Sequence, residues 1–512
     1  MTMTASLIRQ SRCATVEGVF ADRVRVYPDR PALQDGDLIW SFADLDRRVT
    51  RLAHVLRDLG VVRGDRVAIL SENRPEYVEG VLACARIGAI LACQNWRLAL
   101  PELQHCISLV APRVILCSAR YRANLVQLAL SGVRVLDLDN EYDDRLAAAP
   151  SDSIQVDVDP EDGLLILYTS GTTGLPKGAL ISHRAEVARA MAARTDFLMA
   201  PGDTMAVWMP LFHMGGMDYA LTILMGAGKV IVEDGYDPDR LAAIVEREPL
   251  GWFILIPGMV ESMIQTLKRR NSQPKGIRLC GAMADLVPGH QIAEITNLLN
   301  APYANTFGST EAGSLPADAN PIAIGVVPEN LAKRQSPHCE MRLVDQDDND
   351  VPVGIPGELA LRSPTLFSGY WDDEGTNGRD FRGGWFHSGD LLVRYRDGSF
   401  NFVDRKKYMI KSGGENIYPA EIERILLSDP RITEAIVVRR ADDRWGEVPI
   451  AFVARSDETV SIADLRKLCR ANLAGFKQPK DIRFLDHEEF PRNVSGKVLR
   501  HDLEAMLVLG PL

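Results

Sequence analysis

Short apolar runs alternate with helical patterns from about residue 41 to residue 307, and this alternation restricts the fold more than any other feature of the chain. Runs at 67–70, 114–117 and 164–167 have the length of buried strands. Between them lie helical segments, such as the one that Ser41 opens and Gly60 ends. Parallel strands need crossover helices of this kind. We therefore predict two successive α/β sheets, with residues 205–307 forming the second.

The sequence pattern changes near Cys339 and again near Lys407. Residues 358–362, 369–371 and 391–403 read as short strands, with a turn at Asp397-Gly398. The last hundred residues mix strands and helices. A chain of 512 residues exceeds the size of one core. We predict an α/β fold with a large N-terminal domain (1–406), which includes a β-rich subdomain at about 339–406, and a small, mobile α+β C-terminal domain (407–512).

Composition narrows the class of protein. The net charge of −11 and the pI of about 5.4 provide no basic field for nucleic acid. The eight cysteines are scattered without metal-ligand spacing, which favours free thiols in a reducing compartment. The N-terminus lacks an apolar signal core, and no run approaches the ~18 apolar residues of a membrane span. We expect a cytoplasmic protein without a transmembrane segment, and the sequence leaves open whether it forms a homodimer.

The segment Tyr168–Gly178, Y-T-S-G-T-T-G-L-P-K-G, has the composition of a phosphate-binding loop. Glycines let backbone N–H groups approach an anion, and hydroxyl groups add donors around phosphate oxygens. The apolar run before it and the helical segment 183–195 after it argue against a plain flexible linker. Pro176 stands where a Walker A loop requires glycine, so the segment is a different kind of phosphate loop.

This segment resembles the phosphate-binding signature of the adenylate-forming (AMP-binding) superfamily, and further motifs follow in that family's order from about residue 20 to residue 500. The resemblance implies that the loop contacts ATP and that Thr169 also contributes to a Mg²⁺ site. The loop residues predicted to bind the nucleotide are Thr169, Ser170, Gly171, Thr172, Thr173, Gly174 and Lys177.

Three later segments resemble the family's nucleotide-binding motifs. In N-T-F-G-S-T-E (305–311), the resemblance places Phe307 on the adenine with Gly308 beside it, Thr310 at the phosphates, and Glu311 on Mg²⁺. In G-A-M (281–283), it places Gly281 and Ala282 along the adenine. In G-W-F-H-S-G-D (384–390), it assigns Asp390 to the ribose hydroxyls, together with Arg405 of the D-R-K-K run.

Other segments resemble the parts that carry out the chemistry. His213 in M-P-L-F-H-M-G-G is expected near the acyl carboxylate, and Lys497 in P-R-N-V-S-G-K is expected to bridge that carboxylate and the α-phosphate. Gly413 and Gly414 are expected to line the pantetheine tunnel of coenzyme A. Rotation of the C-terminal domain at Lys407 would exchange Lys497 for the glycine loop.

The resemblance implies an AMP-forming acid–thiol ligase of the acyl-CoA synthetase (fatty-acid–CoA ligase) branch. Such an enzyme converts a carboxylic acid and ATP to acyl-AMP and pyrophosphate, and then transfers the acyl group to coenzyme A. Residues 217–228 contain Asp218 but no lysine or arginine. A second substrate carboxylate would be unpaired there, so we expect a neutral aliphatic fatty acid or an aryl acid.

Three alternatives share parts of this pattern. A carrier-protein-loading enzyme for amino acids would need an acid near the His213 segment to hold the substrate amine, and Asp218 is close to that segment. A luciferase-like oxidase uses the same fold. A protein that binds nucleotide without catalysis would release no pyrophosphate.

Overall fold

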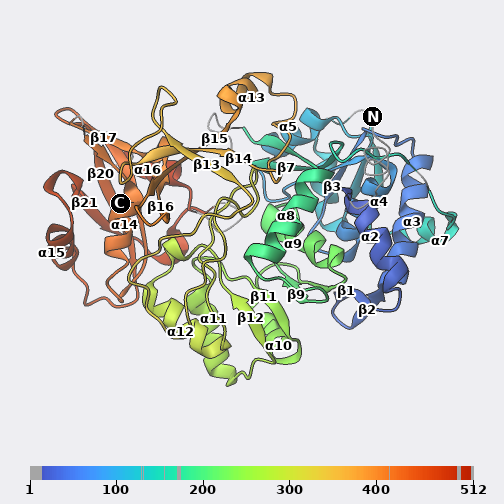
Figure 1. Ribbon diagram of the computed structural model, residues 1–512, viewed down its shortest axis with the longest axis horizontal. Helices are drawn as coiled ribbons and strands as arrows, with labels where there is room; N and C mark the ends of the chain where they lie inside the picture. The colour runs from blue at the N-terminus through green and yellow to red at the C-terminus, as the bar shows by residue number, and fades with distance from the viewer. Residues whose placement is uncertain are drawn as a thin grey trace.

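The structure is a computed structural model that describes residues 14–128, 130, 132–154, 156–169, 175–413, 415–492 and 498–508. Four sheets are arranged along the long axis of the molecule (Figure 1). The first large sheet lies at the right, the second extends below it from the right to the middle, a smaller sheet lies above the middle, and the C-terminal sheet lies at the left. The α/β class, the large N-terminal domain and the small C-terminal domain are thereby confirmed. The boundary at residue 407 and the mobility of the C-terminal domain remain predictions.

The first large sheet has the strand order β6-β5-β3-β4-β7-β8. Its strands are parallel except for the edge strand β8, which pairs antiparallel with β7. The strands are β3 Arg66–Leu70, β4 Ile90–Cys93, β5 Val114–Cys117, β6 Arg134–Asp137, β7 Gly163–Thr169 and β8 Lys177–Ser182.

The second large sheet has the order β12-β11-β9-β10-β1-β2. The first hairpin of the chain joins this sheet, because β1 pairs in parallel with β10. The two sheets are therefore interleaved in sequence and not strictly successive. The strands are β1 Pro31–Asp35, β2 Leu38–Ser41, β9 Thr204–Val207, β10 Lys229–Val232, β11 Leu250–Phe253 and β12 Ile277–Cys280.

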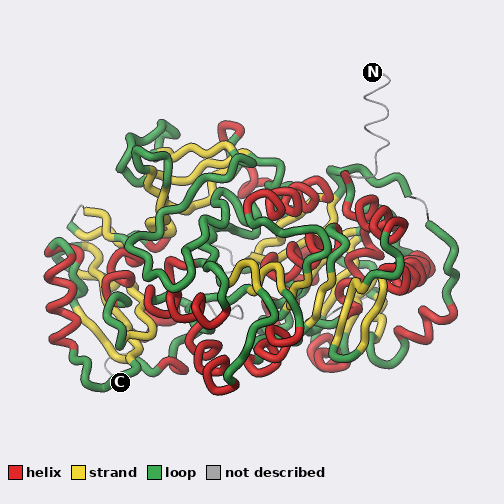
Figure 2. Tube along the Cα trace, turned by 60° about the horizontal axis from the view of Figure 1, so that its bottom comes forward, coloured by secondary structure: helices red, strands yellow, loops and turns green. Residues whose placement is uncertain are grey.

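Helices cover both faces of these sheets (Figure 2). Local signals fix their ends: Ser41 and Asp44 form a reciprocal capping box at the start of α3, and Gly88 ends α4 with φ of 70°. The helices are α2 Val16–Val26, α3 Phe42–Asp58, α4 Pro75–Ile87, α5 Leu100–Val110, α6 Arg122–Val126, α7 Tyr142–Ala148, α8 His183–Asp196, α9 Met214–Met225, α10 Pro238–Arg247, α11 Val260–Arg270 and α12 Gly289–Leu299.

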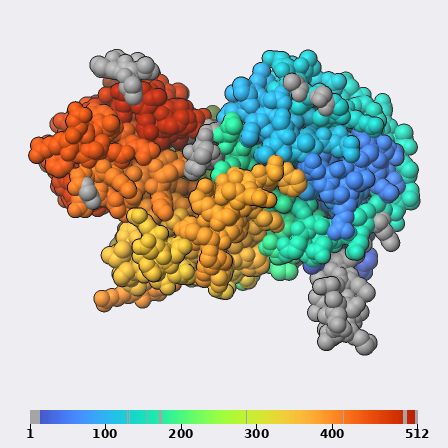
Figure 3. Space-filling model, turned by 90° about the horizontal axis from the view of Figure 1, so that it is seen from above, coloured from blue at the N-terminus to red at the C-terminus, as the bar shows by residue number. Residues whose placement is uncertain are grey.

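A four-stranded antiparallel sheet, β13-β14-β15-β16, forms the predicted β-rich subdomain. Its elements are β13 Glu340–Val344, β14 Gly357–Arg362, α13 Glu374–Asp380, β15 Phe386–Arg394 and β16 Phe400–Arg405. The C-terminal lobe follows, coloured orange and red in Figure 3. It contains β17 Ile410–Ser412, β18 Glu415–Ile417, α14 Pro419–Leu426, β19 Ile432–Asp442, β20 Gly446–Arg455, α15 Ile462–Asn472, β21 Asp481–Phe484 and α16 Arg500–Val508.

Three expected elements differ in the structure. The phosphate loop does not lead directly into a helix, because β8 returns along β7 before α8 begins at His183. Residues 303–307 form no named strand; Tyr303 makes isolated bridges to Cys280 and Ile322. Residues 369–371 are also not a strand, and Tyr370 makes a single bridge to Ala179 of β8. The segments 303–307 and 369–371 are apolar and at least partly buried against other elements, and burial alone does not produce a strand ladder.

The seven cysteines among the described residues are free, and Cys339 alone of these is not fully buried. Burial raises the pKa of the Cys106 thiol to about 12, so it stays protonated at neutral pH. Within the described part of the chain, no helix combines the length and apolar character that crossing a bilayer requires.

Candidate active site

The two ends of the phosphate loop are held next to each other by the β7–β8 pair. Thr169 ends β7, Lys177 begins β8, and their Cα atoms are register partners. The Lys177 ammonium donates to Thr376 Oγ1 at 3.0 Å and lies 5.1 Å from the centroid of the Tyr370 ring. Ser170, Gly171, Thr172, Thr173 and Gly174 lie outside the described residues. The structure therefore fixes the base of the predicted loop.

Glu311, the predicted magnesium ligand, is connected to the two ends of the phosphate loop by Tyr370. The Tyr370 hydroxyl donates to Glu311 Oε1 at 2.8 Å. Burial and the Glu311 carboxylate raise the pKa of Tyr370, so its hydroxyl remains a donor at neutral pH. Lys177, Tyr370 and Glu311 thus form a continuous polar group from segments far apart in the sequence.

Asp390 and Arg405, the two predicted ribose contacts, are register partners on β15 and β16. Arg405 Nε lies 2.6 Å from Asp390 Oδ1, and Asp390 is 2% exposed. The Asp390 carboxylate is the main cause that raises the pKa of Arg405, with Glu311 contributing further. The Glu311 carboxylate is therefore close enough to Arg405 to act on its charge, and the ribose role of the pair stays a prediction.

The segment after β12 has the strained geometry that a glycine permits. Gly281 has φ of 71°, and a Cβ there would lie 2.1 Å from the Tyr303 ring. The Tyr303 hydroxyl donates to the Ala282 carbonyl at 3.0 Å, and the Met283 N–H donates to Thr306 Oγ1 at 2.9 Å. The predicted adenine loop is thereby joined to the segment that carries Phe307.

Phe307, predicted to stack on adenine, is half-buried and packs against Phe402 of β16 with ring centroids 5.5 Å apart. Gly308 follows at a point where a Cβ would lie 2.2 Å from the Gly313 carbonyl oxygen. Ser309 and Gly313 exchange backbone hydrogen bonds at 2.9 and 2.8 Å. Residues 309–313 therefore form a tight loop, which Gly308 connects to Phe307.

His213 is the N-cap residue of α9, and its Nδ1 accepts the Gly215 N–H at 3.1 Å. Burial lowers the pKa of His213 to about 4, so the ring is neutral at pH 7. With Nδ1 accepting, the ring proton resides on Nε2. The following glycine pair is required, because a Cβ on Gly216 would lie 2.5 Å from the Pro210 carbonyl oxygen. His213 can thus donate one hydrogen bond without adding charge.

In the sequence, Asp218 leaves a carrier-loading activity open, because its carboxylate could bind a substrate amine. In the structure this carboxylate is buried and already paired. It is 3% exposed, and its Oδ2 lies 3.0 Å from Arg189 Nη1. Arg189 belongs to α8 and is therefore not among residues 217–228. Residues 217–228 themselves contain no lysine or arginine, and the buried Arg189 beside them is already paired with Asp218.

In the C-terminal lobe, Gly413 has φ of 59°, and the Trp445 indole packs where its Cβ would lie, at 2.7 Å. Lys407 lies in a short 3-10 helix, Lys406–Tyr408, between β16 and β17. Gly414 and Lys497 are outside the described residues. The roles of Lys407 as hinge, of the glycines as tunnel wall and of Lys497 as the bridging cation stay predictions.

Sequence reasoning missed Tyr370 and Arg189. Tyr370 stands in an apolar G-Y-W run that resembles a strand, and its contact with Glu311 spans 59 residues. Arg189 stands in an ordinary-looking helix, and its buried position depends on α9. A local signal exists only for Arg189: α8 carries charged residues on the same face as its buried alanines.

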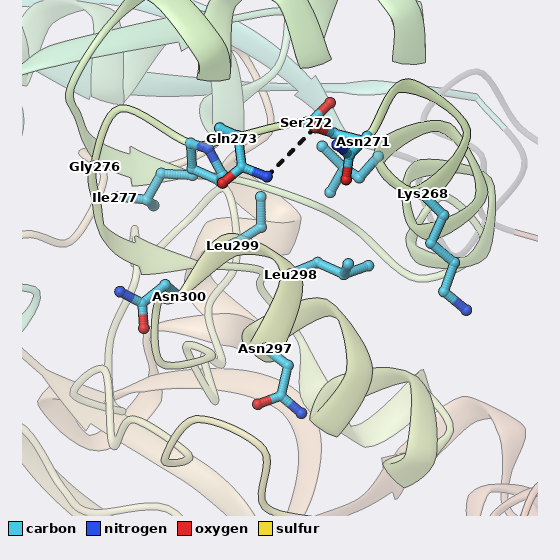
Figure 4. A pocket seen from close by; sticks show the side chains of 12 residues that line it. Lys268, Asn271, Ser272, Gln273, Gly276, Ile277, Asn297, Leu298, Leu299 and Asn300 are labelled. Atoms are coloured by element: carbon cyan, nitrogen blue, oxygen red, sulfur yellow. Dashed lines mark hydrogen bonds between the residues drawn. The ribbon is translucent and has the colours of Figure 1, made fainter.

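A pocket of ≈ 650 Å³ lies elsewhere, where the C-terminal ends of α11 and α12 meet (Figure 4). Both helices end there on asparagines in the left-handed conformation, Asn271 and Asn300. Gln273 Nε2 donates to the Asn271 carbonyl at 3.5 Å across its rim. Its lining contains none of the predicted site residues, so we assign it no part in the chemistry.

Two family models match successive parts of the chain. The family model for AMP-binding enzymes matches residues 20–371, and that for the C-terminal domain of AMP-binding enzymes matches residues 421–497. The indoleacetate–CoA ligase of Aromatoleum aromaticum is 34% identical over 496 residues, covering 94% of this chain and 96% of that protein. The feruloyl-CoA synthase of an Amycolatopsis species is 33% identical, with the same coverage of both chains.

Among solved structures, the O-succinylbenzoate coenzyme A synthetase of Bacillus subtilis, in complex with ATP and magnesium ion, matches with a TM-score of 0.82. It is 26% identical, and the match covers 95% of this chain and 98% of that one. The match spans the large domain and the C-terminal lobe together. The chain therefore belongs to the AMP-binding enzyme family of the adenylate-forming superfamily.

Proposed function

We propose that this protein is an ATP-dependent CoA ligase for an aryl acid. The observation that supports the substrate class is that two relatives more than 30% identical over 94% of the chain are named for indoleacetate and ferulate, both aromatic acids. A long-chain fatty acid, which the sequence left open, has no comparable support among them.

The reaction has two halves. The acid's carboxylate oxygen attacks the α-phosphorus of ATP, forming acyl-AMP and releasing pyrophosphate. The thiol of coenzyme A then attacks the acyl carbon, and AMP departs with the bonding electron pair. A bare carboxylate is a poor electrophile, whereas the mixed anhydride has a stabilised leaving group. The protein's contribution is positioning and charge neutralisation.

The nucleotide's ribose would be held by Asp390, whose orientation is fixed by Arg405 at 2.6 Å. Lys177 would neutralise the departing phosphates from the base of the loop. Neutral His213 would orient the acid's carboxylate through its Nε2–H. Lys497 would bridge that carboxylate and the α-phosphate, and Gly413 and Gly414 would later admit the pantetheine chain. These assignments extend the family pattern to the positions that this chain supplies.

The protein side chains at this site would bind a magnesium ion only together with the phosphates of the nucleotide. Among the described residues, no group of three or more His, Cys, Asp or Glu side chains could hold a metal. Mg²⁺ is typically bound through one or two carboxylates plus substrate phosphates and water. Glu311 and Thr169 would hold such an ion, which supplies charge neutralisation at the phosphates. Tyr370 fixes the Glu311 carboxylate for this role through its hydrogen bond.

The experiment is a panel of acids assayed for pyrophosphate release with and without coenzyme A. The panel contains indoleacetate, ferulate, a long-chain fatty acid, a dicarboxylic acid and an amino acid. We expect pyrophosphate and a CoA thioester with an aryl acid. Preference for the fatty acid would overturn the substrate class. Pyrophosphate without any thioester would favour a carrier protein as acceptor or an oxidase, and ATP binding without pyrophosphate release would overturn the catalytic proposal.

A further inference from the structure

We propose that Arg189 is a positioning residue of the nucleotide site, which holds the loop bearing Thr310 and Glu311 through its backbone. The inference rests on the proposed function, because the loop matters only if it binds nucleotide and magnesium. Arg189 does not contact the Glu311 carboxylate in any described interaction, so its action is indirect. Arg189 belongs to α8 and lies outside all of the sequence motifs.

The three nitrogens of the Arg189 guanidinium each bind a different segment. Nη2 donates to the Thr310 carbonyl at 2.9 Å, Nε to the Thr365 carbonyl at 3.1 Å, and Nη1 to Asp218 Oδ2 at 3.0 Å. Arg189 is 5% exposed. A planar guanidinium fixes the directions of its donors, so three simultaneous contacts determine the relative positions of α8, α9 and both loops.

The loop is closed around the Arg189 side chain. Gly313 has φ of 70°, and a Cβ there would lie 3.0 Å from Arg189 Cγ. The next carbonyls of the loop are also held: Phe367 N–H donates to the Glu311 carbonyl at 2.9 Å, and Thr365 Oγ1 donates to the Ala312 carbonyl at 2.9 Å. Arg189 therefore holds Thr310 directly and also binds Thr365, which holds Ala312.

The energetics of this cluster argue that its role is geometric. Arg189 and Asp218 form a buried ion pair, and Glu186, one turn away on α8, is fully buried; within the part of the chain that the structure describes, neither of its carboxylate oxygens has a hydrogen-bond partner. Burial raises the pKa of Glu186 well above its usual value. Desolvation offsets most of the attraction in a buried pair, and apolar residues often stabilise a core as well. Net stability alone therefore does not account for the pair.

The consequence for the site follows from the chain itself. Glu311 is the residue after Thr310, so a shift of the Thr310 carbonyl displaces the Glu311 side chain from Tyr370 and from any bound cation. Partners that orient a metal ligand typically change metal affinity about 10- to 100-fold when they are removed. We expect loss of the Arg189 contacts to weaken binding of magnesium and ATP by about tenfold or more, and to leave recognition of the acid nearly unchanged.

The test uses the double variant Arg189→Met/Asp218→Asn, which removes both charges together and leaves neither buried alone. The readouts are the dissociation constant of ATP measured by calorimetry with and without Mg²⁺, and the KM values for ATP and for the acid. We expect weaker ATP binding only when Mg²⁺ is present, and a raised KM for ATP but not for the acid. Arg189→Lys keeps the charge opposite Asp218 but lacks the fork of donors, so we expect wild-type stability together with weakened ATP binding in the presence of Mg²⁺.

A matched control is the buried pair of Arg86 and Glu17, with 3.1 Å between Arg86 Nε and Glu17 Oε1, in Arg86→Met/Glu17→Gln. It should change stability without changing affinity for ATP. Unchanged Mg²⁺-dependent ATP affinity in both Arg189 variants would overturn the inference, as would an equal change in the KM values for ATP and acid. If the wild-type protein binds ATP and Mg²⁺ but releases no pyrophosphate, the proposed function fails, whereas the binding measurements still decide the role of Arg189.

Discussion

Asp404 provides a prediction that can be worked out from the structure, because its carboxylate joins the β-rich subdomain to the C-terminal lobe. It lies at the end of β16, is 2% exposed, and its Oδ2 accepts the Ala420 N–H of α14 at 3.0 Å. Oδ1 accepts the Arg405 N–H at 2.7 Å. Burial and the nearby Glu423 raise the pKa of Asp404 to about 6, whereas Arg500 and the two backbone donors oppose the rise.

The direction in which stability changes with pH follows from the linkage between proton binding and folding. Since the pKa is raised above its usual 3.8 in the folded protein, the folded state binds this proton more tightly than the unfolded state does. The stabilisation is complete below the unfolded pKa and is lost as the pH rises through about 6. The full effect is about 3 kcal/mol, and about 1.4 kcal/mol of it falls between pH 5 and pH 8.

The perturbation is Asp404→Asn, which is neutral at every pH. Its free energy of unfolding minus that of the wild type should increase by about 1.4 kcal/mol from pH 5 to pH 8. The loss of one acceptor oxygen shifts this difference at all pH values equally and leaves the slope unchanged. Urea unfolding monitored by fluorescence gives the difference, and hydrogen exchange of the Ala420 amide reports the same contact locally.

Asp347→Asn removes an exposed carboxylate and serves as the control. Its difference from the wild type should stay flat over the same range. A flat difference for Asp404→Asn would refute the reasoning, because it would mean that the carboxylate has the same proton affinity in the folded and unfolded chain.

Other variants test the site. Gly281→Ala should lower the free energy of unfolding by about 2–5 kcal/mol, since it combines a left-handed backbone with overpacking against Tyr303; thermal unfolding measures this, and an unchanged midpoint would contradict the steric argument. Asp390→Ala should raise the dissociation constant of ATP in calorimetry about tenfold or more, because Arg405 loses its partner and the ribose loses an acceptor; wild-type affinity would rule out the ribose role. Lys497→Ala should abolish acid-dependent pyrophosphate release while leaving the thermal midpoint within a few degrees; retained release would show that another cation bridges the phosphate.

Much of the architecture could be predicted because it depends on local patterns. The capping box at Ser41 and the left-handed Gly88 each depend on residues within a few positions, and α3 begins directly after Ser41, where the pattern places it. The strand β8 was missed because Lys177–Ser182 continues a loop motif and makes its ladder only with β7. The apolar runs at 303–307 and 369–371 were mistaken for strands because a buried run has no period that distinguishes a strand from a packed loop.

The sequence by itself determined the family pattern, the order of the motifs and the residue types available for binding a nucleotide. Only the tertiary structure decided how they meet: that Asp390 and Arg405 are register partners, that Tyr370 reaches Glu311 across 59 residues, and that Arg189 reaches Thr310 across 121. Local periodicity reports which face of an element is buried, but not which side chain lies opposite it. Those pairings depend on strand register and helix packing, which many distant contacts fix together.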